Sequence, residues 1–186
     1  MLGHLQRQKS HHYFELLDRD EDGHIDGADF KAQAERLANE RDLSDEEHET
    51  LEEQMLGWWN QLCATADAND DNQVSRGEWE NFWDAIQTTV EDGSDEKREQ
   101  MLSSLEQAGK VTFQTIDASG SGEVTEEEYA NWLEAWGAEG SDMAFDELDR
   151  SGDGTLSEED VVEATKEFYL SNKFDAPGNL LYGSLQ

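Results

Sequence analysis

Apolar residues in this chain recur at intervals of three and four and break off at four short polar stretches. Before each stretch they line one face of a predicted helix, whose last apolar positions are Leu17, Ala66, Ile116 and Leu148. After each stretch a second apolar stripe begins, at Phe30, Trp79, Tyr129 and Val161. The pattern predicts an all-α protein of four helix-loop-helix units, in which each inner stripe closes the core beneath its own loop.

The polar stretches form an internal repeat. They begin at Asp18, Asp67, Asp117 and Asp149, so that successive starts are 49, 50 and 32 residues apart. Ser44, followed by acidic residues, predicts the capped start of the helix that leads into the second stretch. Residues 91–97, which include Gly93 and Ser94, predict a break between two pairs of units. We therefore expect an N-terminal pair in residues 1–92, with loops 18–29 and 67–78, and a C-terminal pair in residues 93–173, with loops 117–128 and 149–160.

Each polar stretch matches the twelve-residue calcium loop of an EF-hand. Such a loop surrounds the ion with oxygen atoms from positions 1, 3, 5, 9 and 12 and from the backbone carbonyl of position 7. The predicted ligands of the first loop are Asp18, Asp20, Asp22, the His24 carbonyl, Asp26 and Asp29, and those of the second are Asp67, Asn69, Asp71, the Gln73 carbonyl, Ser75 and Glu78. Those of the third are Asp117, Ser119, Ser121, the Glu123 carbonyl, Thr125 and Glu128, and those of the fourth are Asp149, Ser151, Asp153, the Thr155 carbonyl, Ser157 and Asp160. We expect up to four Ca2+ sites.

Two further loop positions agree with this assignment. Position 6 needs a left-handed backbone, which glycine adopts freely and asparagine tolerates, and it holds Gly23, Asn72, Gly122 and Gly154. Position 8 forms a short antiparallel bridge between paired loops, which favours aliphatic side chains, and it holds Ile25, Val74, Val124 and Leu156. Four such matches make an ordinary solvated run of charges a poor alternative.

The loops differ at position 12. Glu78 and Glu128 are long enough to offer two oxygens, whereas Asp29 and Asp160 are one methylene shorter and favour a single oxygen. Losing one oxygen moves a site towards the six-coordination that magnesium demands. We expect the second and third loops to be the main calcium sites, and the first and fourth to be weaker or to exchange with Mg2+.

Charge and composition limit the classes of molecule that the protein is expected to bind. With 46 acidic and 13 basic residues the formal charge is −33, which opposes binding to nucleic acid and to anionic membranes and favours cations. The acids outside the loops fit either a surface adapted to high salt or the acidic helices common in EF-hand proteins. The single cysteine, Cys63, excludes an intrachain disulfide, and no stretch is long and apolar enough for a membrane span. We expect a cytoplasmic monomer that binds calcium ions, with a protein partner left open.

No residues indicate an enzyme. The loop acids already have a role as metal ligands, and no nucleophile and base stand apart from them. The histidines, which lack cysteine or acidic partners at the spacing of a zinc site, are expected at the surface: His4, His11, His12, His24 and His48.

The loops, their uneven spacing, the aromatic helices and the segment from Asp175 to Leu185 resemble the compact four-EF-hand group of calerythrin and the sarcoplasmic calcium-binding proteins. Luciferin-binding proteins and calcium-triggered photoproteins are more distantly similar. The resemblance spans essentially the whole chain and implies that a C-terminal tail, residues 174–186, packs on the core. Photoproteins end in a proline after the Tyr-Gly of this tail, whereas this chain ends in Ser184, Leu185 and Gln186, which disfavours light emission.

The residues and this resemblance leave three possible functions. A calcium buffer, or a signal modulator that exchanges calcium for magnesium, would stay closed around its ions. A sensor would open an apolar groove for a partner, and such surfaces favour methionine. Here the helical stripes are rich in tryptophan and phenylalanine, and the chain has only 4 methionines, which favours the buffer. A luciferin-binding or photoprotein-like ligand carrier is the third alternative, since the aromatic residues would either line a cavity or, more commonly, form plain core.

Overall fold

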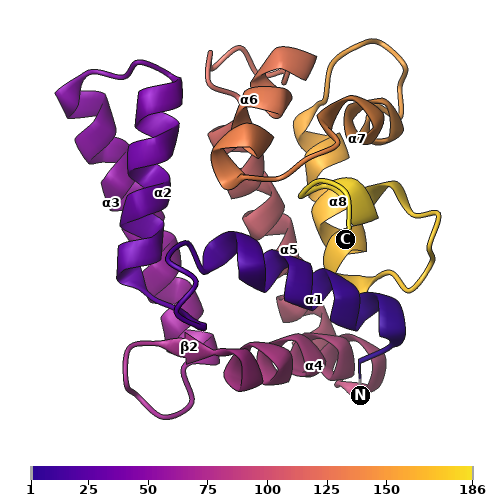
Figure 1. The fold of residues 1–186 in the computed structure, drawn as a ribbon. Coiled ribbons are helices and arrows are strands. Elements are labelled where there is room, and N and C mark those ends of the chain that lie inside the picture. The colour runs from indigo at the N-terminus through magenta and orange to yellow at the C-terminus, as the bar shows by residue number, and fades with distance from the viewer. Residues whose placement is uncertain (1, 186) are drawn as a thin grey trace. The chain divides into compact units, whose positions relative to one another are not determined.

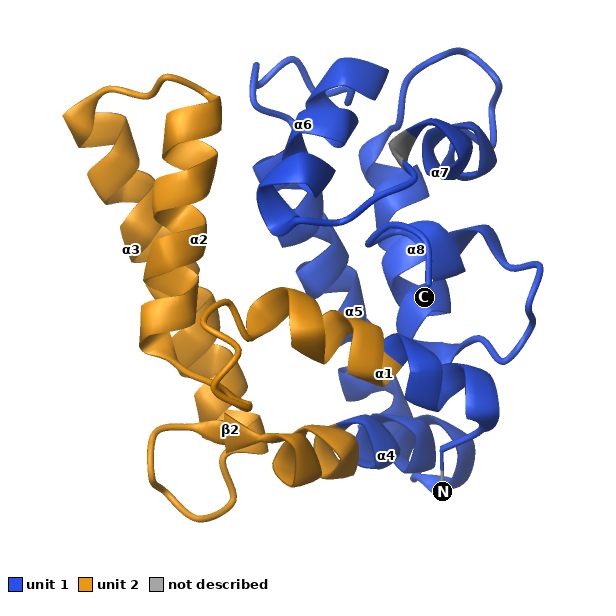
Figure 2. Ribbon diagram, viewed as in Figure 1, with its two compact units in different colours: residues 1–9, 83–186 blue, residues 10–82 orange. Residues whose placement is uncertain are grey.

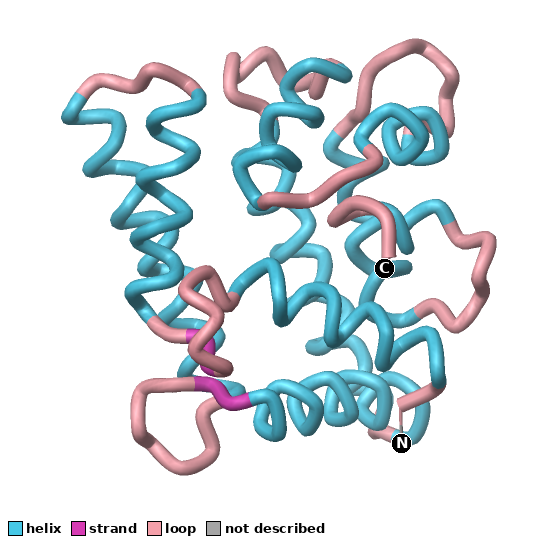
Figure 3. The backbone as a smooth tube through the Cα atoms, viewed as in Figure 1, coloured by secondary structure: helices cyan, strands magenta, loops and turns pink. Residues whose placement is uncertain are grey.

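The structure is a computed structural model that describes residues 2–185, apart from the side chain of Ser141. Met1 and Gln186, the outer ends of the expected domain ranges, lie outside the described residues. Within these residues the chain is mostly helical, with loops between the helices and one short pair of strands (Figures 1 and 3). The helices are α1 (His4–Leu17), α2 (Gly27–Glu40), α3 (Asp45–Ala66), α4 (Arg76–Asp92), α5 (Asp95–Ile116), α6 (Glu126–Trp136), α7 (Ser141–Leu148) and α8 (Glu158–Leu170), followed by the 3-10 turn η1 (Pro177–Leu180). The strands are β1 (His24–Ile25) and β2 (Val74–Ser75). The predicted all-α class is confirmed.

The bridges predicted at loop position 8 are also present. β1 and β2 pair in antiparallel fashion, with Ile25 opposite Val74 and His24 opposite Ser75. An isolated antiparallel bridge joins Val124 to Leu156. All four position-8 side chains are completely buried, so each bridge also contributes to a core.

Helix starts follow the capping residues. Ser44 accepts a hydrogen bond from the backbone N–H of Glu47, whose side chain returns to the Ser44 N–H, as the sequence predicted for the start of α3. The predicted break after α4 falls at Gly93 and Ser94, and Ser94 caps α5. Across residues 2–185, no helix combines the length and apolar character that a bilayer span requires.

The chain divides into two compact units (Figure 2). Unit 1 comprises Met1–Lys9 and Trp83–Gln186, and unit 2 comprises Ser10–Phe82, so the boundaries fall within α1 and α4. The first and second loops lie in unit 2, and the third and fourth lie in unit 1. The functional division into the two expected domains stays a prediction.

Unit 2 is built around aromatic contacts. The Phe30 and Trp59 rings lie 5.9 Å apart between α2 and α3. Phe14 packs edge-on against Trp79 at 6.2 Å, and the Trp79 indole N–H donates to the Ser10 carbonyl at 2.8 Å. These aromatic residues hold together the helices that carry the first and second loops.

Unit 1 depends on a close approach of α5 and α8. Gly109 faces Val162, and a Cβ atom at Gly109 would lie 2.7 Å from the Val162 Cα and 3.3 Å from the Thr165 Cβ. Only glycine permits this helix separation without a shift of the backbone.

Substituting Gly109→Ala is therefore expected to lower the free energy of unfolding by roughly 1–3 kcal/mol, because the overpacking outweighs the better helix propensity of alanine. Urea unfolding measures the change. Gly57→Ala on α3 is the control, since nothing lies within 4 Å of a Cβ there. It should stabilise by roughly 0.5–1 kcal/mol. Equal effects of the two substitutions would contradict the proposed helix contact.

The chain after α8 folds back onto unit 1. The Tyr129 hydroxyl donates to the carbonyls of Leu180 at 3.1 Å and Leu181 at 3.0 Å, and burial raises the pKa of this tyrosine. The Tyr182 ring packs against Trp132 and Phe168 at 5.6 Å and 4.9 Å. Leu181 and Tyr182 are buried, so this segment fills space over α6 and α8 that would otherwise expose apolar side chains.

Lys9 is an unexpected member of the same core. Its side chain is completely buried, and its ammonium donates to the carbonyls of Glu167 (3.1 Å) and Ser171 (2.7 Å) and to Oδ1 of Asn179 (3.1 Å). The two carbonyls belong to the C-terminal end of α8, where a cation is favoured by the helix dipole. Burial lowers the pKa of Lys9 to about 7, although the nearby Glu167 carboxylate opposes this shift. Lys9 thereby joins α1, α8 and the C-terminal segment.

Candidate metal centres

The first residue of each loop organises the turn that follows it. One carboxylate oxygen of Asp18, Asp67, Asp117 and Asp149 accepts the backbone N–H of position 6, at 3.0, 2.9, 2.9 and 2.8 Å respectively. Position 6 has the left-handed backbone that this turn requires, with φ of 62° at Asn72 and between 86° and 89° at the three glycines. The prediction that Asn72 adopts the left-handed backbone in place of a glycine is confirmed.

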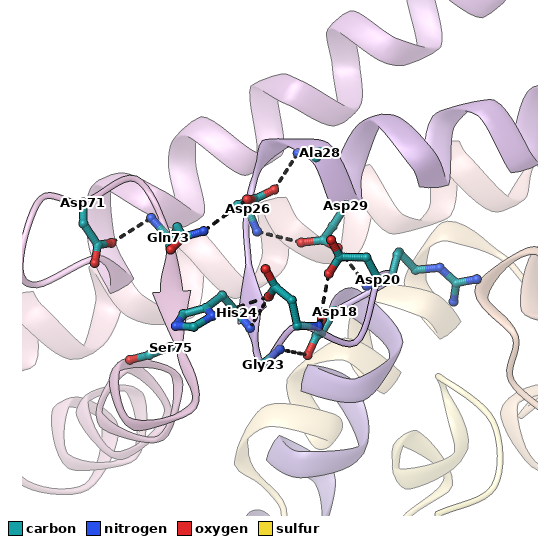
Figure 4. A network of polar contacts seen from close by, with 12 residues as sticks. Asp18, Asp20, Gly23, His24, Asp26, Ala28, Asp29, Asp71, Gln73 and Ser75 are labelled. Atoms are coloured by element: carbon teal, nitrogen blue, oxygen red, sulfur yellow. Dashed lines mark hydrogen bonds and ion pairs between the residues drawn. The ribbon is translucent and has the colours of Figure 1, made fainter.

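The first loop brings its carboxylates together most clearly (Figure 4). Ligand oxygens of Asp18, Asp20 and Asp22 lie within 4.8 Å of one another. The Asp22 N–H donates to both Asp18 and Asp20 at 3.1 Å, so the backbone of position 5 holds the first two acids. Asp18 is only 5% exposed, whereas Asp20 and Asp22 lie at the surface.

Positions 9 and 12 act as a capping box for the helix that leaves each loop. In the first loop Asp26 accepts the Ala28 N–H at 2.7 Å, and the Asp26 N–H donates to Asp29 Oδ2 at 2.7 Å. Ser75 with Glu78, Thr125 with Glu128 and Ser157 with Asp160 repeat this exchange. The residues that the sequence assigns to the metal are therefore also the residues that begin the helices.

Position 12 also closes three of the loops. The second carboxylate oxygen accepts a backbone N–H from the start of the same loop: Arg19 to Asp29 at 2.8 Å, Ala68 to Glu78 at 3.1 Å and Ser119 to Glu128 at 2.9 Å. Among the described residues, Asp160 is held by Ser157 alone, through its backbone N–H and its hydroxyl. Asp29 thus spans its loop despite its shorter side chain, whereas Asp160 does not. Sequence patterns carry no signal for these backbone donors.

The acids at position 12 also differ in pKa. Burial raises the pKa of Asp29, against the lowering effect of the Asp26 and Arg19 N–H groups. Hydrogen bonds from the Ser75 hydroxyl and N–H lower the pKa of Glu78. Burial raises the pKa of Glu128, but the donors of Thr125 and Ser119 outweigh it and the net shift is downward. Burial thus makes the Asp29 carboxyl easier to protonate than a free aspartate, whereas hydrogen bonds make those of Glu78 and Glu128 harder to protonate than a free glutamate.

The remaining predicted ligands lie along the loop turns. In the second loop Asn69 and Asp71 accept the N–H groups of Asp71 and Gln73, at 2.9 and 3.0 Å. In the third, the Ser121 hydroxyl donates to the Glu123 carbonyl at 2.8 Å and brings positions 5 and 7 together. In the fourth, Asp153 accepts both the N–H and the hydroxyl of Thr155, at 3.1 and 2.9 Å.

The donor set fits a hard cation. Every predicted ligand offers oxygen, and the carboxylates of position 1 are already oriented by the turn and those of position 12 by the capping box. Calcium takes such oxygen ligands in flexible geometry. The residues present could hold the ion, and the assignment of each residue as a ligand remains a prediction.

Comparisons with known proteins also indicate a similarity to EF-hand proteins. A family model described as EF hand matches residues 11–32 and 110–133, which contain the first and third loops. Sarcoplasmic calcium-binding proteins I, III and IV of Branchiostoma lanceolatum are 28% identical over 134 residues, covering 70% of each sequence.

Solved structures extend the likeness over the whole chain. The amphioxus sarcoplasmic calcium-binding protein is 25% identical, with a TM-score of 0.72 and 99% coverage of both chains. The coelenterazine-binding protein of Renilla muelleri has a TM-score of 0.76 at 22% identity, covering 98% of this chain and 96% of its own, and shares the fold.

The fold and the loops are similar to those of EF-hand calcium-binding proteins. Within that class the chain is similar to the sarcoplasmic calcium-binding proteins, as the loop spacing and the tail predicted.

Proposed function

We propose that this protein is a calcium buffer, or a signal modulator that exchanges calcium for magnesium, rather than a sensor that recruits a partner. The observation that carries this proposal is the C-terminal segment of unit 1. Leu181 and Tyr182 occupy the apolar space over α6 and α8, and the Tyr129 hydroxyl holds their backbone. A sensor needs such a surface for the helix of its partner.

The composition of the surface supports the same choice. Met143 and Phe174 are the large apolar side chains exposed among the described residues, at 62% and 76%. Met55 is completely buried, and the aromatic residues beneath the loops, such as Trp79 and Trp132, are buried as well. Few adaptable methionines are available to form a promiscuous docking face.

The proposed ligand sites are not equivalent. We propose that the second and third loops, which end in Glu78 and Glu128, keep calcium in the presence of magnesium. The first and fourth, which end in Asp29 and Asp160, exchange the two ions, because a single carboxylate oxygen favours six-coordination. The contacts of Asp160 support this most directly, since it is held at one end of its loop only.

Calcium titration of the magnesium-loaded protein tests both parts. Calorimetry is expected to resolve two sites that ignore millimolar magnesium and two whose apparent calcium affinity falls with it. An environment-sensitive apolar dye should show no gain in fluorescence when calcium is added. A calcium-dependent rise in dye fluorescence would favour a sensor, and four equal sites indifferent to magnesium would contradict the exchange.

A further inference from the structure

Gln73 reaches from the second loop to the first. It stands at position 7, and its side-chain Nε2 donates to Oδ2 of Asp26 at 3.4 Å (Figure 4). The register of β1 and β2 explains the contact: Ile25 is opposite Val74, and extending this register by one residue beyond the strands places Asp26 opposite Gln73. Directly opposed side chains in an antiparallel pair are close enough to interact.

With this contact, each carboxylate oxygen of Asp26 accepts a hydrogen bond. Oδ1 of Asp26 accepts the Ala28 N–H at 2.7 Å, and Oδ2 accepts from Gln73. The Asp26 N–H donates to Asp29 Oδ2, so the orientation of position 9 is linked to that of position 12. Each Asp26 oxygen thus has one donor, and position 9 of an EF-hand loop often meets its ion through a water molecule.

The backbone of Gln73 belongs to the second loop. Its backbone N–H donates to Asp71 Oδ1 at 3.0 Å, and its carbonyl is the predicted position-7 ligand. An ion in the second loop would therefore fix the backbone of Gln73, and a fixed backbone restricts where its amide can lie. Asp71, Gln73, Asp26 and Asp29 form one continuous chain of hydrogen bonds between the two loops.

We propose that Gln73 is a positioning residue that couples calcium binding in the second loop to calcium affinity in the first. The inference deepens the proposed function and rests on calcium binding by these loops. With the second loop filled, the Gln73 amide is already ordered and holds the Asp26 carboxylate for the first loop. By linkage, an ion in the first loop favours the second by the same factor.

The second pair of loops lacks a side-chain hydrogen bond of this kind. Among the described residues, the third and fourth loops are joined by the two backbone hydrogen bonds between Val124 and Leu156, at 2.9 and 2.8 Å, without a side-chain bond between the loops. By the same register Thr155 and Thr125 take the places of Gln73 and Asp26, and the short Thr155 side chain instead donates its hydroxyl to Asp153 within its own loop, at 2.9 Å. Coupling through a side chain is thus specific to the first pair.

The test is a calcium titration of the full chain followed by NMR, with the position-6 amides of Gly23, Asn72, Gly122 and Gly154 as reporters of the individual loops. Gln73→Met keeps the length and neutrality of the side chain but removes the donor. It is expected to raise the calcium concentration at the midpoint for Gly23 by about fivefold, near the lower end of typical coupling factors. The midpoints for Gly122 and Gly154 should stay unchanged.

Asp26→Ser provides the matched background. Serine holds position 9 in the second and fourth loops and caps helices, but it is too short to reach Gln73. In Asp26→Ser protein, adding Gln73→Met should leave the Gly23 midpoint where it was.

The outcomes distinguish a failure of the proposed coupling from a failure of the proposed calcium binding. An unchanged Gly23 midpoint in Gln73→Met, an equal shift of all four reporters, or the same shift in both backgrounds would overturn the coupling. If no reporter of the unsubstituted protein responds to calcium, the proposed function fails first, and the coupling fails with it.

Discussion

Removal of calcium is expected to lower the free energy of unfolding by about 5 kcal/mol, if the second and third loops alone are filled at an ion concentration of about a hundred times their dissociation constants. Each such site contributes about 2.7 kcal/mol, because the ion binds the native state and not the unfolded chain. Filling of the first loop would add to this difference, because ligand oxygens of Asp18, Asp20 and Asp22 lie within 4.8 Å of one another without an ion. Their mutual repulsion weakens the native state without the ion. Urea unfolding with saturating calcium and with a chelator measures the difference.

Potassium chloride at matched ionic strength is the control for this experiment. With a formal charge of −33 the protein will respond to any salt through screening, but screening does not place a cation among the loop oxygens. Potassium should therefore recover only a minor part of the stability. Unfolding curves that coincide in calcium and in chelator would show that the loops do not bind the ion.

The second large effect is a rise in stability with pH through Lys9. Its pKa is about 7 in the native state, against 10.5 for a free lysine side chain. Between these values the unfolded chain binds a proton that the native protein has released, so raising the pH favours the native state. The slope is about 1.4 kcal/mol for each pH unit, and it vanishes below about pH 7, where both states are protonated. Urea unfolding of calcium-saturated protein across this range checks it.

Comparison with Lys9→Met isolates this contribution from other groups that titrate in the same range. The unsubstituted protein should gain stability relative to Lys9→Met as the pH rises. Lys110→Met is the matched control, since Lys110 lies at the surface paired with Glu106 at 2.8 Å and its pKa is raised by that carboxylate. The difference in stability between the unsubstituted protein and Lys110→Met should stay constant between about pH 7 and pH 10, because Lys9 is present in both. Parallel curves for the unsubstituted protein and Lys9→Met would contradict a neutral, buried lysine.

The repeated loop pattern predicted most of the fold. Ligand spacing, the left-handed position 6 and the aliphatic position 8 are local rules, and each can be read within twelve residues. The left-handed backbone of Asn72, the capping box at Ser44 and the bridge between Val124 and Leu156 all follow from such rules. Helix pairing around the loops then needs little further information.

The features that the sequence did not predict depend on residues far apart in the chain. In the sequence nothing distinguishes Lys9 from a surface lysine. In the structure the C-terminal end of α8 and Asn179 surround its ammonium group. Gln73 was expected to act through its carbonyl, and only the register of β1 and β2 shows where its amide goes. The closing contact of Asp29 with the Arg19 N–H offsets the shorter side chain, which ligand length alone would not indicate.

The hydrogen bonds by which position 12 closes three of the loops have a consequence for the kinetics of ion binding. Because Asp29, Glu78 and Glu128 are already held across their loops by backbone donors, the chain is largely preorganised before a cation arrives. Capture of an ion would then exchange these hydrogen bonds for metal bonds, and the ion would have to lose water to make them. Magnesium gives up its water reluctantly. Calcium could enter a magnesium-filled first loop only after the magnesium had left, so the time course of a calcium pulse would depend on which ion occupied the loops beforehand.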